Sequence, residues 1–169
     1  MSSDDVCLRR IDPDDLAEAQ AIFDDLSAYS LCVDGAAQTW SGHEFATAVP
    51  VGHGLQHKHP FIASQRGLPV GLLDIVKDYP AVGTAFIGLL AIREKAQGTG
   101  LGRCLYVKAE QFIRENLDAR IIRLAVVETN PVIGFWEKMG FRPTGEIKPY
   151  QGQAVSSRSI QMEKVLSEL

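Results

Sequence analysis

The sequence predicts an α/β protein in which helices cover both faces of one mixed β-sheet. The expected elements run strand, helix, short helix, two paired strands, strand, helix, strand, helix and two closing strands. A second observation is the glycine-rich turn 97–102, which separates an apolar strand from a helix with regularly spaced apolar residues. A length of 169 residues suits one domain, so we expect residues 1–169 to form a single unit.

The first half of the chain is expected to contain a strand, a capped helix and a hairpin. Asp12 followed by Pro13 is typical of a helix start, and apolar residues from Leu16 onward recur on one face. Residues 30–60 are ambiguous: a short helix fits 40–49, and 52–60 is expected to be a loop. The strands expected in this half are 6–11, 61–64 and 70–76.

The second half is expected to contain a βαβ unit, a short helix and a closing hairpin. The helix after the glycine turn is predicted to end near Asn116. Asn130 and Pro131 are expected to cap and begin the short helix, and Gly140 to end it in a left-handed stop. The strands expected in this half are 86–92, 121–127, 141–150 and 155–165.

Composition excludes several classes of protein. The net charge is −4 and no basic run is present, which argues against a nucleic-acid partner. Three cysteines without close spacing indicate neither a disulfide framework nor a zinc site. The histidine-rich stretch 53–59, which includes Lys58, is expected to be a loop, and we expect no metal. No signal-like or membrane-spanning stretch is present, so we expect a cytoplasmic protein without a membrane partner.

The run from Gln97 to Gly102 favours a phosphate-bearing ligand. Its glycines let the backbone approach a ligand closely, and the first amides of the following helix have no intrahelical partner. Such a helix end favours phosphate. A P-loop is excluded because Arg103 follows Gly102 where Lys-Ser/Thr is needed, and the glycine spacing does not fit a dinucleotide fingerprint.

Two blocks resemble the GNAT N-acetyltransferases. The run Gln97-Gly98-Thr99-Gly100-Leu101-Gly102 resembles the family's acetyl-CoA signature, Gln/Arg-x-x-Gly-x-Gly/Ala. About 30 residues further on, Asn130 precedes Glu-Lys-Met-Gly-Phe at 137–141, as in the family's second block. The resemblance covers about 70–165, and the first 60 residues match only in layout. It implies a central mixed, mostly antiparallel, twisted sheet flanked by helices on both faces.

The resemblance also implies acetyl-CoA as the acetyl donor, with no metal. Its pyrophosphate is expected on the amides of the glycine turn, with Arg103 either adding charge or simply solvated. The pantetheine arm is expected beside the strand before the turn, where an amide near Leu90 could stabilise the oxyanion. The cofactor-binding residues implied are Leu90, Ala91, Ile92, Gln97, Gly98, Thr99, Gly100, Leu101, Gly102, Arg103, Asn130, Phe135 and Trp136.

The sequence identifies the candidate catalytic residues less clearly than the cofactor-binding residues. Trp136 stands where the family usually has an acidic Tyr, and its indole is a poor proton donor, so we interpret it as a cleft wall or a core aromatic. Tyr150, or Tyr79, is the candidate hydroxyl, although each could be a packing residue. Asp74 interrupts an apolar strand and is the candidate base, unless it faces solvent or pairs with an Arg. Glu128 is the second candidate base.

We therefore predict an acetyl-CoA-dependent N-acetyltransferase that acts on a primary amine of a small molecule, by direct attack in a ternary complex. Acids and aromatics in 28–60, 78–82 and 148–156 suit a cationic amine. The alternative is a catalytically silent acyl-CoA-binding sensor or interaction module, favoured by Trp136 and by the lack of a carboxylate in 86–92. The resemblance leaves a homodimer open.

Overall fold

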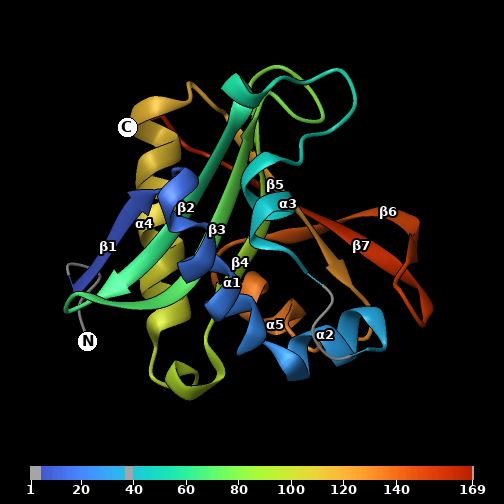
Figure 1. The fold of residues 1–169 in the computed structure, drawn as a ribbon. Helices are drawn as coiled ribbons and strands as arrows, with labels where there is room; N and C mark the ends of the chain where they lie inside the picture. The colour runs from blue at the N-terminus through green and yellow to red at the C-terminus, as the bar shows by residue number, and fades with distance from the viewer. Residues whose placement is uncertain (1–4, 37–39, 169) are drawn as a thin grey trace.

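Seven strands of the described chain, residues 5–36 and 40–168 of the computed structural model, form one mixed sheet (Figure 1). Their order is β1-β2-β3-β4-β5-β7-β6. Only β4 and β5 are parallel, and every other neighbouring pair is antiparallel, which confirms the predicted mixed fold. The strands are β1 (Val6–Arg10), β2 (Lys58–Gln65), β3 (Leu68–Lys77), β4 (Thr84–Ile92), β5 (Ile121–Val127), β6 (Arg142–Gln151) and β7 (Ser156–Val165).

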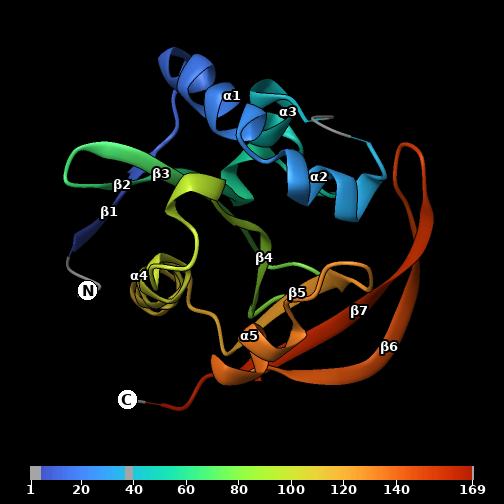
Figure 2. The ribbon, with the colours of Figure 1, turned by 90° about the horizontal axis from the view of Figure 1, so that it is seen from below.

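Helices cover both faces of the sheet (Figure 2). On one face lie α1 (Leu16–Asp24), α2 (Ser27–Asp34) and α3 (Gly42–Thr47). On the other lie α4 (Leu101–Asn116) and α5 (Ile133–Lys138). No helix in the described part of the chain is both long enough and apolar enough to span a bilayer.

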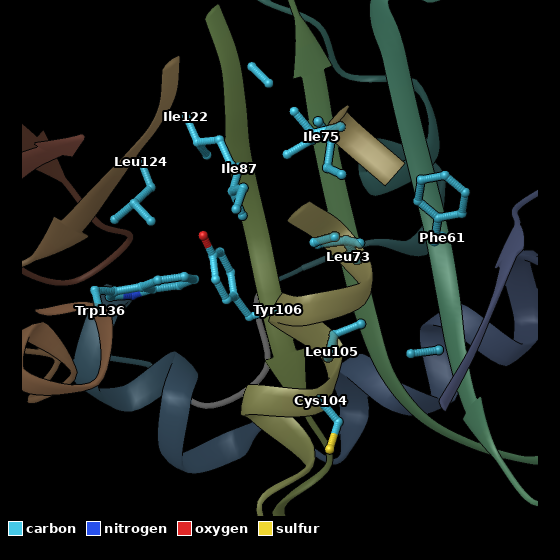
Figure 3. Close-up of a cluster of buried hydrophobic side chains, with 14 of the residues drawn as sticks. Phe61, Leu73, Ile75, Ile87, Cys104, Leu105, Tyr106, Ile122, Leu124 and Trp136 are labelled. Atoms are coloured by element: carbon cyan, nitrogen blue, oxygen red, sulfur yellow. The ribbon is translucent and has the colours of Figure 1, made fainter. Parts of the chain in front are cut away.

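Two clusters of buried apolar side chains join these layers. Leu72 of β3 belongs to the cluster under α1 and α3, whereas its neighbour Leu73 belongs to the cluster under α4. This alternation is the period of two that a strand buried on both faces requires. Figure 3 shows part of the second cluster, in which Leu105 of α4 lies against the sheet. The helices are therefore held to opposite faces by consecutive strand residues.

A β-bulge at Gly88 reverses the facing of β4. Asp74 of β3 lies opposite Leu89, but the next residue, Ile75, lies opposite Ile87, so Gly88 is an extra residue on β4. Ile87 belongs to the cluster under α4, whereas Leu89 belongs to the cluster under α1. On β4, odd-numbered side chains therefore face α4 before the bulge and α1 after it.

The parallel strands β4 and β5 separate just beyond this bulge (Figure 1). They pair only from Thr84 opposite Ile121 to Ile87 opposite Leu124. Beyond Ile87, no described strand pairs with the edge of β4 that faces β5. Gly88 is consequently exposed although it lies in a central strand. The separation opens the middle of the sheet and leaves main-chain donors and acceptors available.

Several boundaries differ from the sequence prediction, and two of these differences bear on the site. Residues 52–60 were expected to form a loop, but β2 already begins at Lys58, whose side chain is only 3% exposed. The short helix begins at Ile133 rather than Pro131, because the amide of Val132 bonds to the carbonyl of Asn130 in a preceding turn. The expected Asn130 cap is therefore wrong, since Val132 occupies the N-cap position and no side chain caps α5.

The contact between α4 and the sheet should supply much of the stability. Leu105→Ala removes a fully buried side chain from the cluster under α4 and should cost about 2–5 kcal/mol in the free energy of unfolding. Val107→Ala, on the exposed side of the same helix, should change it by less than about 0.5 kcal/mol. Urea unfolding of both variants measures the difference, and equal losses would contradict the assigned faces of α4.

Candidate active site

A cavity of about 440 Å³ lies where β4 and β5 separate, and we call it the split cleft. It is bounded by both strands, by α2, by α5 and by the start of α4. Eight of the thirteen residues expected to bind acetyl-CoA line it: Leu90, Ala91, Ile92, Gln97, Gly102, Asn130, Phe135 and Trp136. Segments far apart in the sequence therefore meet around one space, as the two sequence blocks predict.

The glycine turn brings backbone amides to one end of the split cleft. Gly98 and Gly100 have φ angles of 75° and 84°, in the left-handed region that side chains disfavour. The amide of Cys104 bonds to the carbonyl of Gly100, which makes it the first amide of α4 with an intrahelical partner. The amides of Leu101 to Arg103 are therefore available to an anion, and the helix dipole favours one there.

Side chains of the turn hold its backbone in place. Gln97 Nε2 donates to the carbonyl of Ile92 at 2.9 Å, which ties the turn to the end of β4. Thr99 Oγ1 donates to the carbonyl of Ala96. Leu101 is buried in the core, and Arg103 lines a separate depression on the outer side of α4. Arg103 therefore does not line the split cleft, so its charge is not in the wall where the pyrophosphate is expected.

Trp136 is both a wall of the split cleft and a core aromatic residue, the two interpretations that its sequence position allows. It lines the split cleft and is only 7% exposed. Its ring meets those of Phe135, Phe141 and Tyr106 edge to face, at centroid distances of 5.0, 5.3 and 5.8 Å. Figure 3 shows Trp136 near Tyr106 at the margin of the core. It is thus a rigid wall whose position is set by aromatic packing.

Asn130 lines the cleft with an amide that the fold does not use. Its side chain makes no hydrogen bond to any residue in the described ranges, and it does not cap α5. An amide side chain supplies two donors and an acceptor, which suits a pantetheine arm with its own amide groups.

Asp74 stands beside the bulge, on the face of the sheet that carries α1 and α3. It is 8% exposed, and Lys58 Nζ donates to its Oδ2 at 2.9 Å. A Cβ placed on Gly88 would lie 2.8 Å from Oδ2, so a larger residue there would displace the carboxylate from its present position. Burial raises the pKa of Asp74, and the attraction of Lys58 opposes that rise. Its Oδ1 is buried without a partner in the described chain, which adds to the desolvation.

A second cavity of about 220 Å³ adjoins Asp74, and we call it the aromatic hollow. The residues that line it are Phe23, Trp40, Ser41, Glu44, Phe45, Ala48, Lys58, Asp74, Gly88 and Leu89. Gly88 and Leu89 also line the split cleft. The two cavities therefore share the bulge as a wall, which we call their junction, and the Asp74 carboxylate lies beside it.

Lys58 was missed by sequence reasoning, which placed it in a loop. Counting the register of the β2–β3 hairpin gives the missing signal, because Asp74 lies opposite Pro60 and Lys58 lies two residues before Pro60, at the start of β2. Diagonal positions of this kind share one face of a sheet. Asp74 therefore neither faces solvent nor pairs with an Arg, because its partner among the described residues is Lys58.

Tyr150 is not brought together with Asp74. Its hydroxyl donates to Asp34 Oδ1 at 2.8 Å, and it lines neither the split cleft nor the aromatic hollow. Burial and the hydrogen bond to Asp34 raise its pKa, which makes it a weaker acid. Trp40 Nε1 donates to the other oxygen of Asp34. The acid role of Tyr150 stays a prediction, and this geometry favours a structural one.

Glu128, the second candidate base, is engaged elsewhere. Its carboxylate accepts hydrogen bonds from Arg158 and Ser157, and Arg158 Nη2 lies 2.8 Å from it. The hydrogen bond from Arg158 lowers the pKa of Glu128, which makes it a weaker base. Tyr79, the other candidate hydroxyl, contacts His53 and Phe86 edge to face. Among the candidates for base, Asp74 alone lies at the junction of the two cavities.

Comparison with solved structures shows a shared fold. An acetyltransferase from Thermus thermophilus is 24% identical, with a TM-score of 0.73 over 98% of this chain and 100% of that one. The spermidine N-acetyltransferase of Vibrio cholerae, in complex with CoA and spermine, is 16% identical, with a TM-score of 0.73 over 96% of each chain. The ribosomal-protein-S18-alanine N-acetyltransferase of Escherichia coli is 19% identical, with a TM-score of 0.67 over 97% of this chain and 96% of that one.

Sequence comparison adds the family. A search of proteins with curated function gave no match. A family model described as acetyltransferase (GNAT) family matches residues 20–141, which are 122 of the 169 residues. The matched range includes the β4–β5 separation, the glycine turn, Asp74 and α5. With its fold, its split cleft and this match in agreement, the chain belongs to the GNAT family of acetyltransferases.

Proposed function

We propose that this protein transfers the acetyl group of acetyl-CoA to a primary amine of a small molecule, by direct attack in a ternary complex. The observation that carries the proposal is the junction of two cavities at Gly88 and Leu89. One cavity suits an extended thioester arm, and the other holds a carboxylate. An amine and a thioester bound on the two sides would be held in reacting distance, which supplies much of the rate.

The split cleft supports acetyl-CoA as the donor. The amides of residues 98–103 would bind the pyrophosphate, and the free edge of β4 at Leu90 to Ile92 would pair with the pantetheine arm. Asn130 would bond to an amide of that arm, and Phe135 and Trp136 would wall it. A β4 amide at this edge would also donate to the oxyanion of the tetrahedral intermediate.

Asp74 is the base in this proposal. The amine nitrogen bonds to the thioester carbon, the carbon–sulfur bond breaks, and the proton of the amine passes to Asp74 Oδ2 beside Gly88. CoA leaves as a thiolate, which a thiol pKa of about 8.5 allows without a strong acid. Burial equips Asp74 for this role because it raises the pKa of the carboxyl.

The aromatic hollow supports a small acceptor. Its volume of about 220 Å³ fits a small molecule better than a folded protein terminus. Among the structures that share the fold, one protein is named for spermidine and another for a ribosomal protein, so the fold itself serves both classes.

Asp74→Asn should lower kcat/KM for thiol release by at least about 100-fold, because the amine loses its proton acceptor. Glu128→Gln, which removes a carboxylate outside both cavities, should leave kcat/KM nearly unchanged. Thiol release from acetyl-CoA with a library of amines measures both. The change at Asp74 also leaves Lys58 unpaired, so the double variant Lys58→Met with Asp74→Asn provides a folded form without that charge.

The proposal fails if the folded double variant keeps wild-type turnover. Binding of acetyl-CoA with no thiol release from any amine would instead identify a silent acyl-CoA-binding module.

Gly100→Val should weaken acetyl-CoA binding at least about tenfold, equivalent to about 1.4 kcal/mol, because the valine disfavours the φ of 84° that opens α4. Gly67→Val is the matched control. Its φ is 78°, a Cβ there also meets open space, and it lies in the β2–β3 turn. Calorimetric titration with acetyl-CoA compares the two, and equal affinities would refute the role of the glycine turn.

Lys58→Met should move the acid limb of the kcat/KM profile to higher pH. Lys58 lowers the pKa of Asp74, so its removal leaves burial unopposed and raises that pKa further. A base with a higher pKa is protonated, and hence inactive, up to a higher pH. Profiles of the variant and the wild type with one amine measure the shift, and an unmoved limb would exclude Asp74 as the titrating group.

A further inference from the structure

We infer that the acceptor is a primary monoamine whose only other part is an apolar group about the size of a phenyl ring, bound in the aromatic hollow. This inference rests on the proposed function and adds the class of substrate. It depends on three properties of the hollow: its walls, its charges and its size.

The walls are aromatic on the side of the helices. Phe23 lies 5.6 Å from Trp40 and 5.5 Å from Phe45 between ring centroids, so the three rings form one surface. Tyr29 lies 5.2 Å from Trp40 and supports it from α2. Burial of an apolar group on such a surface is favourable by about 25 cal/mol per Å². The body of the acceptor is therefore expected to be apolar.

The charges of the hollow leave room for one ammonium group and no further ion. The positive charge of Lys58 balances Asp74, and Lys58 Nζ also lies 5.8 Å from the centroid of the Phe45 ring. A second cationic group would be repelled by the positive charge of Lys58. An anionic group would meet Asp74 and Glu44, and the one lysine there is already paired. The third charge, Glu44, is exposed and screened by solvent, so it attracts a distant ammonium only weakly.

The volume of the hollow indicates the size of the group that its walls can surround. A cavity of about 150 Å³ accommodates a benzene ring. The hollow measures about 220 Å³, which leaves space for a two-carbon arm that ends at the junction beside Gly88. A phenyl group among the three rings would place its amine next to Asp74. 2-Phenylethylamine is therefore the probe that matches walls, charge and size together.

The test compares kcat/KM for thiol release from acetyl-CoA with four amines. Phenylalanine keeps the phenyl group and adds a carboxylate, spermidine adds further cationic groups, and ethylamine lacks the ring. We expect 2-phenylethylamine to exceed each of the other three at least about tenfold. Preference for spermidine or phenylalanine would overturn the inference and leave the proposed function standing.

A variant tests the location. Ala48 is exposed and lines the hollow, so Ala48→Phe should fill part of the space without disturbing the core. We expect the KM for 2-phenylethylamine to rise at least about tenfold. Thr47→Phe, at the neighbouring exposed position that does not line the hollow, is the matched control.

The outcomes separate the two claims. An unchanged KM in Ala48→Phe, or an equal rise in Thr47→Phe, would overturn the assignment of the hollow even if amines are acetylated. Absence of thiol release with every amine would instead refute the proposed function, and the inference with it.

Discussion

The separation of β4 from β5 is the constraint on which the rest of the site depends. Two parallel strands that pair at only four positions leave main-chain groups unpaired in the middle of a sheet. Buried unpaired groups of this kind are costly, so the space must contain water or a ligand that bonds to them. The split cleft, the placement of the α4 N-terminus at its end and the exposure of Gly88 all follow from this separation.

The bulge at Gly88 and the buried Lys58–Asp74 pair lie side by side and together shape the region beside the split cleft. A buried ion pair contributes little net stability, because desolvation of both charges offsets their attraction. The role proposed for Asp74 as the base would account for this buried pair, which its contribution to stability does not. The bulge also turns Leu89 toward α1, which shapes the floor of the aromatic hollow.

Sequence patterns predicted the helices and strands of this protein better than the surroundings of its candidate catalytic residues. The helix that ends at Asn116 and the strand 121–127 were predicted because their periodicity and glycine signals are local. Lys58 was assigned to a loop because a lysine between histidines does not resemble a buried strand, and only its register with Asp74 reveals the pair. Gly88 offered a signal, since a glycine inside a strand often marks a bulge. Asn130 was misassigned as a cap because its carbonyl accepts from the amide of Val132 in a turn, and the helix begins only after that turn, at Ile133.

Asp34 connects parts of the molecule that otherwise have separate tasks. It lies at the end of α2, which borders the split cleft, and it accepts hydrogen bonds from Trp40 in the aromatic hollow and from Tyr150 near the tip of the β6–β7 hairpin. One carboxylate thus connects a helix of the split cleft, a wall of the aromatic hollow and a surface loop. A substitution in that loop that removes the Tyr150 hydroxyl would therefore alter the support of both cavities through this single carboxylate.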